Sequence, residues 1–422
     1  MKTKFLILLL LISCSTAAKK EKMDVLSCIQ IEDRNGLTET IQSKERVGKY
    51  EKIDFLSHQP YQKVLRVFEK NKEGKSKSII TSYHPNGQIA EFLEAQEMRA
   101  FGAYRSWFTN GQQKVEALVI GGPADLSSTA QQEWLFDGIS KAWDEQGNLS
   151  AELPYQKGKL HGLAIHYHQN GNARQTLKYD QDVLEGEVKT YDEDGSLLIQ
   201  QTYQNNSLEG PSIAYWNNEM PAWIEYYQKG KLETGQYFDE TGSQCSEIQK
   251  GQGWKTIYHQ DGTYQRVEFQ KGQPEGTVEV NTSQKELISS YTLRNGKKQG
   301  TEKHFYLFSE VQALNRPKLT IDWDSDLVHG MTKTWYPSGK QESQREFAKN
   351  QRNGMSFAWY QDGSLMYAEE YELDLLMKGT YYHHGQIVSK IIDGSGIATI
   401  YDNEGVFIRK INYKEGKPTE MP

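Results

Sequence analysis

One pattern of apolar and polar positions recurs along most of the chain, and residues 162–186 show it most clearly. Leu163, Ile165 and Tyr167 alternate with the residues between them, and this period of two is typical of a β-strand. The polar loop 169–171 follows and ends in a glycine, which can adopt the positive φ that a three-residue hairpin loop requires. A second strand is expected directly after the loop. The stretch therefore predicts one β-hairpin and a turn into the next.

The same pattern repeats with a regular spacing. If the opening glycine is position 0, an aromatic residue lies at position 5, a glycine at position 9 and a second aromatic residue at position 17, as in Gly162, Tyr167, Gly171 and Tyr179. Most intervals between opening glycines are 23 to 25 residues. This length fits two strands and two short turns and is too short for a β-α-β unit. The opening glycines are Gly102, Gly138, Gly162, Gly186, Gly210, Gly235, Gly253, Gly276, Gly300, Gly330, Gly354, Gly379 and Gly396.

A second tight turn is predicted at position 20 of each copy. Most copies have Gly, Asn or Asp there, and these residue types enter the left-handed backbone region most easily. Because the chain reverses at this turn, we expect the ring of Tyr179 to cover the next opening glycine, Gly186. The residues at position 20 are Gly158, Asp182, Asn206, Gly230, Gly296, Asn350, Asp374 and Gly416.

Four intervals depart from the regular spacing. The two longest contain extra residues at about 121–132 and 308–317, and the two that begin at Gly235 and Gly379 shrink to 18 and 17 residues. Insertions in repeat proteins often form loops on a binding face, and variation in exposed loops is the alternative. Stability in such arrays is local, so we expect the irregular copies around residues 219–253 to be less protected from hydrogen exchange than the regular run.

The spacing of glycines and aromatic residues resembles the MORN repeat family in its bacterial variant. Gly162, Tyr167, Gly171 and Tyr179 carry the resemblance, which extends over residues 78–422. It implies an all-β fold, namely an elongated single-layer antiparallel sheet of about thirteen tandem β-hairpins. It also implies a scaffold that contacts proteins or membranes. Some bacterial chains with this variant are described as the antitoxin component of a toxin–antitoxin system.

The beginning of the chain predicts export and lipid anchoring. Residues 1–13 combine two lysines with an apolar run and are interpreted as a signal peptide. Leu11-Ile12-Ser13-Cys14 resembles a lipobox, so Cys14 is the expected lipidation site, and Ser15 after it favours the outer membrane. Residues 14–24 would be the lipidated tether and residues 25–77 a degenerate N-terminal β cap. An ordinary signal peptide with a chance cysteine is the alternative.

Composition and motifs argue against several functions. The formal net charge is −7, and nucleic-acid binding would favour a basic face. The sequence contains no nucleophile elbow, phosphate-binding loop or zinc motif, and a thin sheet provides no deep pocket. We therefore expect no enzymatic activity, no cofactor, no metal and no small-molecule substrate. Cys28 and Cys245 lie far apart in sequence, and we expect no disulfide between them.

The aromatic residues at position 5 are the candidate interaction face, since such side chains are enriched at binding hot spots. The alternative is that this row is the packed side of the sheet. The leading hypothesis is an envelope scaffold that binds a macromolecule and is held to the membrane by its lipid. Binding of glycan or peptidoglycan, and an antitoxin role, are the alternatives. The predicted face comprises Trp107, Trp143, Tyr167, Tyr191, Trp335 and Trp359.

The anchor prediction can be tested with Cys14→Ala. Removal of the thiol should abolish labelling by radioactive palmitate and move the chain from the detergent-extracted to the soluble fraction. A variant that still requires detergent for extraction would show that Cys14 is not the anchor.

Overall fold

The computed structural model describes residues 25–217 and 219–419. This part of the chain contains 34 strands, β1 to β34, and three short helices, α1 to α3. The strand pairs are antiparallel, and most join strands that are consecutive in sequence. The predicted all-β fold of tandem antiparallel hairpins is therefore confirmed. Cys14 and the predicted signal and tether lie outside the described residues.

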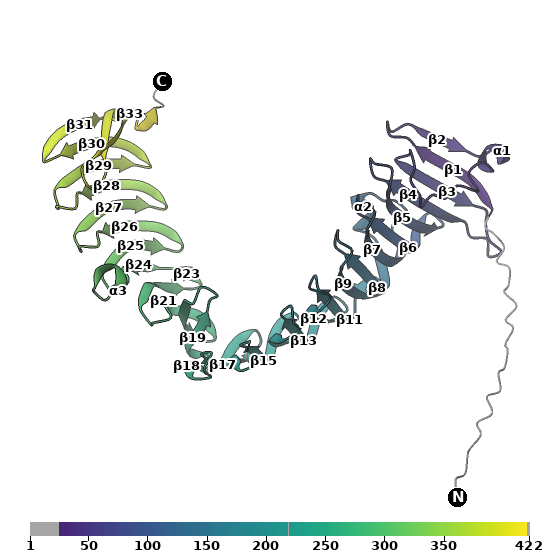
Figure 1. Ribbon diagram of the computed structural model, residues 1–422, viewed down its shortest axis with the longest axis horizontal. Coiled ribbons are helices and arrows are strands. Elements are labelled where there is room, and N and C mark those ends of the chain that lie inside the picture. The colour runs from purple at the N-terminus through teal and green to yellow at the C-terminus, as the bar shows by residue number, and fades with distance from the viewer. Residues whose placement is uncertain (1–24, 218, 420–422) are drawn as a thin grey trace, which may run out of the picture. The chain divides into compact units, whose positions relative to one another are not determined.

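The chain divides into two compact units, which are described separately. The first extends to Ala173 and includes Tyr179–Asp182. In it β1 pairs with β2 and β3, each later strand pairs with the next as far as β9, and β9 pairs with β10 and β11 (Figure 1). Its elements are β1 (Leu26–Glu32), β2 (Thr38–Ile41), α1 (Lys44–Val47), β3 (Lys63–Phe68), β4 (Lys77–Tyr83), β5 (Ile89–Gln96), β6 (Arg99–Trp107), β7 (Gln113–Gly121), α2 (Ser128–Gln131), β8 (Leu135–Trp143), β9 (Leu149–Gln156), β10 (Lys159–Leu160) and β11 (Gly162–Tyr167).

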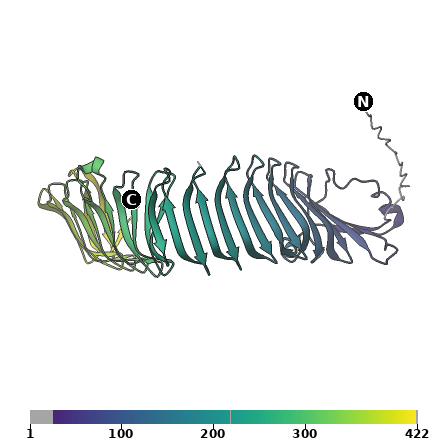
Figure 2. The same ribbon diagram turned by 90° about the horizontal axis from the view of Figure 1, so that it is seen from below.

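The second unit contains Arg174–Lys178 and the chain from Val183 onward. β12 (Ala173–Asp180) has residues in both units. Successive strands of the second unit lie side by side (Figure 2). β22 pairs with both β23 and β24. Its elements up to β23 are β13 (Val183–Tyr191), β14 (Leu197–Gln204), β15 (Ser207–Tyr215), β16 (Pro221–Gln228), β17 (Lys231–Phe238), β18 (Gln244–Gln249), β19 (Gln252–Tyr258), β20 (Tyr264–Gln270), β21 (Gln273–Asn281), β22 (Leu287–Arg294) and β23 (Lys297–Lys298).

The remaining elements continue the same succession to the end of the described chain. They are β24 (Gly300–Phe305), α3 (Phe308–Val311), β25 (Pro317–Asp324), β26 (Leu327–Trp335), β27 (Gln341–Ala348), β28 (Gln351–Trp359), β29 (Leu365–Glu372), β30 (Leu375–His383), β31 (Gln386–Ile392), β32 (Ser395–Tyr401), β33 (Phe407–Lys414) and β34 (Lys417–Thr419).

The turn predicted at position 20 is present and has positive φ at both central residues. Gln181 and Asp182 have φ of 50° and 71°, and Asn205 and Asn206 have φ of 51° and 63°. This is the geometry of a type I′ turn, whose twist matches that of the flanking strands. All eight residues predicted at this position have positive φ. The preference for Gly, Asn and Asp is thereby explained.

Asp and Asn at this turn also connect successive hairpins. The backbone N–H of Asp182 donates to the carbonyl of Leu160 at 2.9 Å, and its Oδ1 accepts the N–H of Leu160 at 2.7 Å. Asn350 makes the same two bonds with Val328, at 2.9 and 2.7 Å. Gly230 can make only the backbone bond, to Leu208 at 3.0 Å. An Asx residue therefore contributes one more hydrogen bond between neighbouring repeats than glycine does.

The opening glycines lie in bulges that accommodate an acidic side chain. Gly354 has φ of 110°, and a Cβ there would lie 2.1 Å from Oε2 of Glu346 on the neighbouring strand. The same carboxylate accepts the N–H of Met355 at 3.3 Å. Glu268 has the equivalent place beside Gly276 and accepts the N–H of Thr277 at 2.8 Å. Glycine is needed there for its backbone conformation and for the space that the carboxylate occupies.

The expectation that Tyr179 covers Gly186 is wrong. The side chain nearest to a Cβ at Gly186 is Lys178, at 3.0 Å. Gly186 instead pairs across the ladder with Tyr203, the second aromatic residue of its own copy. At the equivalent place of a later copy the ladder skips from Arg345 to Phe347, and Glu346, the residue before the aromatic one, lies beside Gly354.

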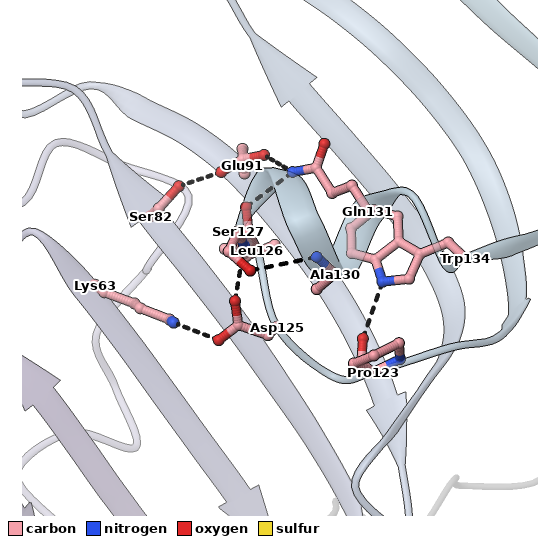
Figure 3. A network of polar contacts seen from close by, with 10 residues as sticks. All are labelled: Lys63, Ser82, Glu91, Pro123, Asp125, Leu126, Ser127, Ala130, Gln131 and Trp134. Atoms are coloured by element: carbon pink, nitrogen blue, oxygen red, sulfur yellow. Dashed lines mark hydrogen bonds and ion pairs between the residues drawn. The ribbon is translucent and has the colours of Figure 1, made fainter.

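The first insertion folds onto the sheet. Leu126, Ala130 and Trp134 are buried, and Leu126 and Trp134 join Tyr104 and Val119 in one apolar cluster. Figure 3 shows the polar contacts that hold the segment: Asp125 accepts from Lys63 at 3.2 Å, Gln131 donates to Glu91 at 2.8 Å, and the Trp134 indole donates to the Pro123 carbonyl at 2.9 Å. The segment is thus a packed cover in this unit.

The second insertion, unlike the first, leaves its large apolar side chains exposed. It contains α3, and Phe308 and Leu314 are 44% and 72% exposed. Within the described residues this segment keeps large apolar side chains in solvent, whereas the first insertion buries them.

The two shortened copies contain the best-packed clusters of the second unit. Tyr237, Leu232 and Ile248 are at most 1% exposed, and Tyr381 and Leu376 have the same low exposure in the other short copy. At the turn edge Gly272 accepts the N–H of Leu232 at 3.3 Å and donates to Gly251 at 2.9 Å. The short hairpin is set back there, so the turns on both sides meet over it. This burial favours slow rather than fast hydrogen exchange at Leu232, Tyr237 and Ile248, within the stretch 219–253 for which the sequence predicts low protection.

Substitution of an opening glycine should test the bulge. Gly354→Ala should destabilise the chain by roughly 2–3 kcal/mol, because the Glu346 carboxylate must move aside and lose its bond from Met355, which adds to the strain of positive φ. Gly195→Ala is the matched control, since Gly195 has φ of 92° and no atom within 4 Å of a Cβ; it should cost only about 1 kcal/mol. Urea denaturation measures both. Equal losses would contradict the role of the carboxylate.

Hydrogen exchange should distinguish the short copies from the regular ones. Backbone amides of β17 and β20 should exchange more slowly than those of β14, because the former pack against a buried cluster. Mass spectrometry of exchanged peptides measures the difference. Faster exchange in β17 would contradict the packing argument.

Candidate functional site

The six aromatic residues predicted as an interaction face share one position in the fold. Each is the last residue of its strand, and each is half-buried. Some have defined contacts: Tyr167 donates to Glu152 at 2.9 Å, and the ring of Trp359 stacks on that of Phe357 at 6.0 Å. None of them lines either cavity of the described chain. The row therefore stays a predicted interaction face at the strand ends.

The residue after this row, at position 6, connects neighbouring hairpins in several copies. The Tyr336 hydroxyl donates to the backbone carbonyl of Trp359 at 2.6 Å, and Tyr306 donates to that of Trp335 at 2.7 Å. Tyr360 makes the equivalent bond to Tyr382 at 2.7 Å. In each case a side-chain donor bonds the amide carbonyl of the next copy and holds the hairpin ends together.

Trp216 is the exception at this position. Its Nε1 is buried, and it has no hydrogen-bond partner among the residues that the structure describes. The ring packs edge-on against Tyr258 with 5.3 Å between centroids, and Tyr258 lies 5.6 Å from Tyr264. These three aromatic residues come from the end of β15, the end of β19 and the start of β20. They line a groove at the hairpin ends.

The groove has a volume of about 1250 Å³. Three aromatic side chains and a larger set of polar ones surround it. We refer to it as the Trp216 groove, and its lining residues are Trp216, Asn217, Asp239, Glu240, Thr241, Ser243, Gln244, Cys245, Thr256, Tyr258, His259, Gln260, Gly262, Tyr264, Arg266, Ser283 and Lys285.

Charged groups in the groove have partners that offset them. Arg266 lies 3.1 Å from Glu279 and 4.6 Å over the ring of Trp254. The hydrogen bond from Thr241 lowers the pKa of Asp239, whose carboxylate also accepts the N–H of Ser243. The electrostatic character of the site is therefore mixed rather than strongly acidic or basic.

The Tyr258 hydroxyl and the Cys245 thiol are 3.2 Å apart in the groove. Burial raises the pKa of Tyr258, and the hydrogen bond with Cys245 raises it further. The phenol is thus held in its neutral form, as a hydrogen-bonding group. Cys245 and Cys28 are both free thiols.

A smaller cavity of about 230 Å³ lies at the corresponding place in the second short copy. Tyr360 lies in this copy where Trp216 lies in the first short copy, 144 residues earlier in the chain. In the same way His383 corresponds to Asp239. The ring of His383 stacks on Tyr401 at 4.2 Å and fills part of the space. The bond from Tyr360 to Tyr382 joins the hairpin ends here. The two short intervals in the sequence marked both places, but the spacing alone gave no reason to expect a cavity.

The short copies also contain buried carboxylates with an internal role. Glu225 accepts the hydroxyls of Tyr227 and Tyr237 at 2.9 and 2.7 Å and pairs with Lys255 at 2.6 Å. Glu369 accepts Tyr371 and Tyr381 at 3.1 and 2.6 Å.

Burial raises the pKa of Glu369, and its two tyrosine donors oppose the increase. Both oxygens of each carboxylate accept a hydrogen bond from a side chain of the same cluster, so these groups are parts of the core.

Two features are absent from the described residues. His, Cys, Asp and Glu side chains there form no group of three or more that could hold a metal ion. The same residues include no helix of sufficient length and apolarity to cross a membrane.

These features define a β-hairpin repeat protein with a groove at one shortened copy. The family model of the MORN repeat variant matches residues 136–157 and 184–205, two of the predicted copies, and so supports the resemblance to that family. The resemblance inferred from the glycine and aromatic spacing is confirmed. No curated protein matches the sequence.

Solved structures show only distant similarity. The TcdB2–TccC3–TEV crystal structure is 9% identical over 90% of this chain and 24% of its own, with a TM-score of 0.16. The TcdB2–TccC3 structure without its hypervariable C-terminal region is 9% identical over 84% and 24%, with a TM-score of 0.13. A porin-like protein from Bacteroides uniformis is 9% identical over 78% and 93%, with a TM-score of 0.12. The chain spans about a quarter of the first two, and these values support no functional argument.

The bond that joins the hairpin ends at the second cavity can be tested with Tyr360→Phe. Loss of the hydroxyl leaves the Tyr382 carbonyl without this donor and should cost about 0.5–1.5 kcal/mol. Trp216→Phe is the comparison, because it removes an N–H that has no partner in the described chain. The free energy of unfolding in urea measures both. An unchanged stability of Tyr360→Phe would show that the bond contributes nothing.

Proposed function

We propose that the protein is a non-enzymatic envelope lipoprotein whose repeat array is a scaffold for binding another macromolecule. The observation that carries the proposal is the ladder of hairpins connected at both edges. Asp182 and its equivalents connect the turns at one edge, and Tyr336 and its equivalents connect the strand ends at the other. Such a ladder fixes the spacing of the side chains along each unit, as an extended contact surface requires.

The family supports the coarser part of this proposal. MORN repeats form scaffolds for interaction and are typically non-catalytic. The buried carboxylates of the short copies agree with a structural role, because tyrosine hydroxyls donate to both and Lys255 pairs with Glu225.

The finer part of the proposal concerns location and partner. The lipobox around Cys14 supports attachment to the membrane through a lipid, and Ser15 supports the outer membrane. The half-buried aromatic residues at the strand ends support an envelope protein as partner, because aromatic rings supply large contact areas at hot spots.

Site-specific crosslinking tests the scaffold function. A photoreactive phenylalanine analogue replaces Trp335 in the full chain, and the matched control carries it at Lys349, in the turn at the other edge of the same repeat. Irradiation of intact cells should give a discrete adduct with an envelope protein from position 335 and none from 349. The same adduct should disappear in Cys14→Ala. The analogue is also placed at Trp359, a second residue of the predicted face. If neither Trp335 nor Trp359 gives an adduct, the proposal is overturned.

A further inference from the structure

We propose that Lys231, Lys250 and Lys271, at the turn edge of the short copy that begins at Gly235, form a docking site for an acidic peptide segment of a partner protein. We refer to these three residues as the lysine cluster. The inference rests on the proposed scaffold function and deepens it, because it names the chemistry of the partner at a place outside the predicted aromatic row.

Backbone contacts hold the three turns of the lysine cluster together. The N–H of Leu232 donates to the carbonyl of Gly272 at 3.3 Å, and the N–H of Gly272 donates to that of Gly251 at 2.9 Å. Lys231 directly precedes Leu232, and each of the two glycines directly follows one of the other lysines. A Cβ at Gly272 would lie 3.0 Å from the Cβ of Lys231. The three lysine side chains therefore start from turns that touch one another.

The positive charges of the lysine cluster are not offset by neighbouring acids. All three side chains are exposed, and none of them has an ion pair within the described residues. Glu233 accepts the N–H of Gly251 through its backbone carbonyl, and its carboxylate pairs with no lysine in the same part of the chain. Like charges on adjacent turns repel one another, so an anion that binds among them is stabilised by all three.

The second short copy shows that the backbone arrangement does not require lysines. There the N–H of Leu376 donates to the carbonyl of Gly416 at 3.0 Å, as that of the equivalent leucine does in the first short copy. In the order of the lysine cluster, the corresponding residues are Leu375, Asp393 and Glu415. The same turns thus fold with one apolar and two acidic side chains. The positive charge of the lysine cluster is therefore available for binding rather than needed for folding.

Turns of other copies show which group such a turn binds. In several copies the first turn residue donates its backbone N–H to an acidic side chain that directly precedes the opening glycine of the same copy. Lys157 donates to Asp137 in this way at 2.8 Å, and Asn205 donates to Glu185 at 2.9 Å. The chain itself therefore pairs this turn N–H with a carboxylate.

The turns of Lys250 and Lys271 lack such an internal carboxylate. The residues that precede the opening glycines of their copies are Thr234 and Gln252. The backbone N–H groups of both lysines have no hydrogen-bond partner within the described residues. An acidic peptide carries successive carboxylates on one chain, so it can accept from these two N–H groups and from the ammonium groups around them. Such charge complementarity favours an acidic partner over a neutral or basic one.

Fluorescence anisotropy of labelled hexaglutamate with the full chain tests the inference, and labelled hexaglutamine is the uncharged probe. Hexaglutamate should bind, and hexaglutamine should not. The triple variant Lys231→Gln/Lys250→Gln/Lys271→Gln should bind hexaglutamate at least tenfold more weakly, because it removes all three ammonium groups.

The matched control is Lys157→Gln/Lys159→Gln/Lys349→Gln, which removes three exposed lysines from the turn edge of regular copies. Its affinity for hexaglutamate should stay within about twofold of the wild-type value. Gln252→Glu restores an acid before the opening glycine and should weaken the binding several-fold, whereas Gln252→Ala should leave it unchanged. Circular dichroism verifies that each variant is folded.

Failure of hexaglutamate to bind, equal losses in the two triple variants, or equal affinity of the two Gln252 variants would overturn the inference. Vesicles that contain phosphatidylglycerol are the probe for a membrane. Their binding to the lysine cluster without binding of hexaglutamate would assign the cluster to a lipid surface and overturn the inference as well. Each of these results would leave the crosslinking test of the scaffold function unaffected, so the two proposals fail separately.

Discussion

The structure depends on backbone conformations that most residues avoid. Every hairpin must reverse twice, and the reversal at position 20 has two consecutive residues at positive φ. Asp182 and Asn350 tolerate this conformation and use their side chains to bond the preceding turn. One residue therefore closes a hairpin and attaches it to its neighbour. A sheet built from short local units becomes continuous through such bonds.

The opening glycine shows how a bulge is combined with electrostatics. At Gly354 and Gly276 the neighbouring strand places a carboxylate over the glycine, and the next backbone N–H donates to it. The acidic residue, the glycine and the bulge therefore act together: the glycine leaves room for the carboxylate, and the carboxylate accepts the next N–H. Where Lys178 or Pro154 replaces the acid, beside Gly186 and Gly162, the glycine keeps its positive φ and the carboxylate bond is lost. The backbone requirement is thus more general than the side-chain contact.

The shortened copies contain both tightly packed apolar clusters and the two cavities described above. Removal of residues from one hairpin brings the backbone on its two sides together, as the hydrogen bond from Leu232 to Gly272 shows. Tyr237, Leu232 and Ile248 then form a cluster with almost no exposure. At the opposite ends of the same strands, the hairpins leave a cavity. Tyr360 bridges that position in one short copy, and Trp216 leaves it open in the other.

The sequence by itself determined the repeat, its two kinds of turn and the all-β class, because each depends on local backbone preferences and on a period of two. It also marked the short and long intervals. Tertiary structure alone decided what those intervals do: the segment around Leu126 and Trp134 packs onto the sheet, whereas Phe308 and Leu314 stay exposed. It also decided that Lys178 rather than Tyr179 lies nearest to a Cβ at Gly186, because that contact depends on how two neighbouring strands are placed and not on a local pattern. The Trp216 groove belongs to this second group, since it exists only where strands of unequal length meet.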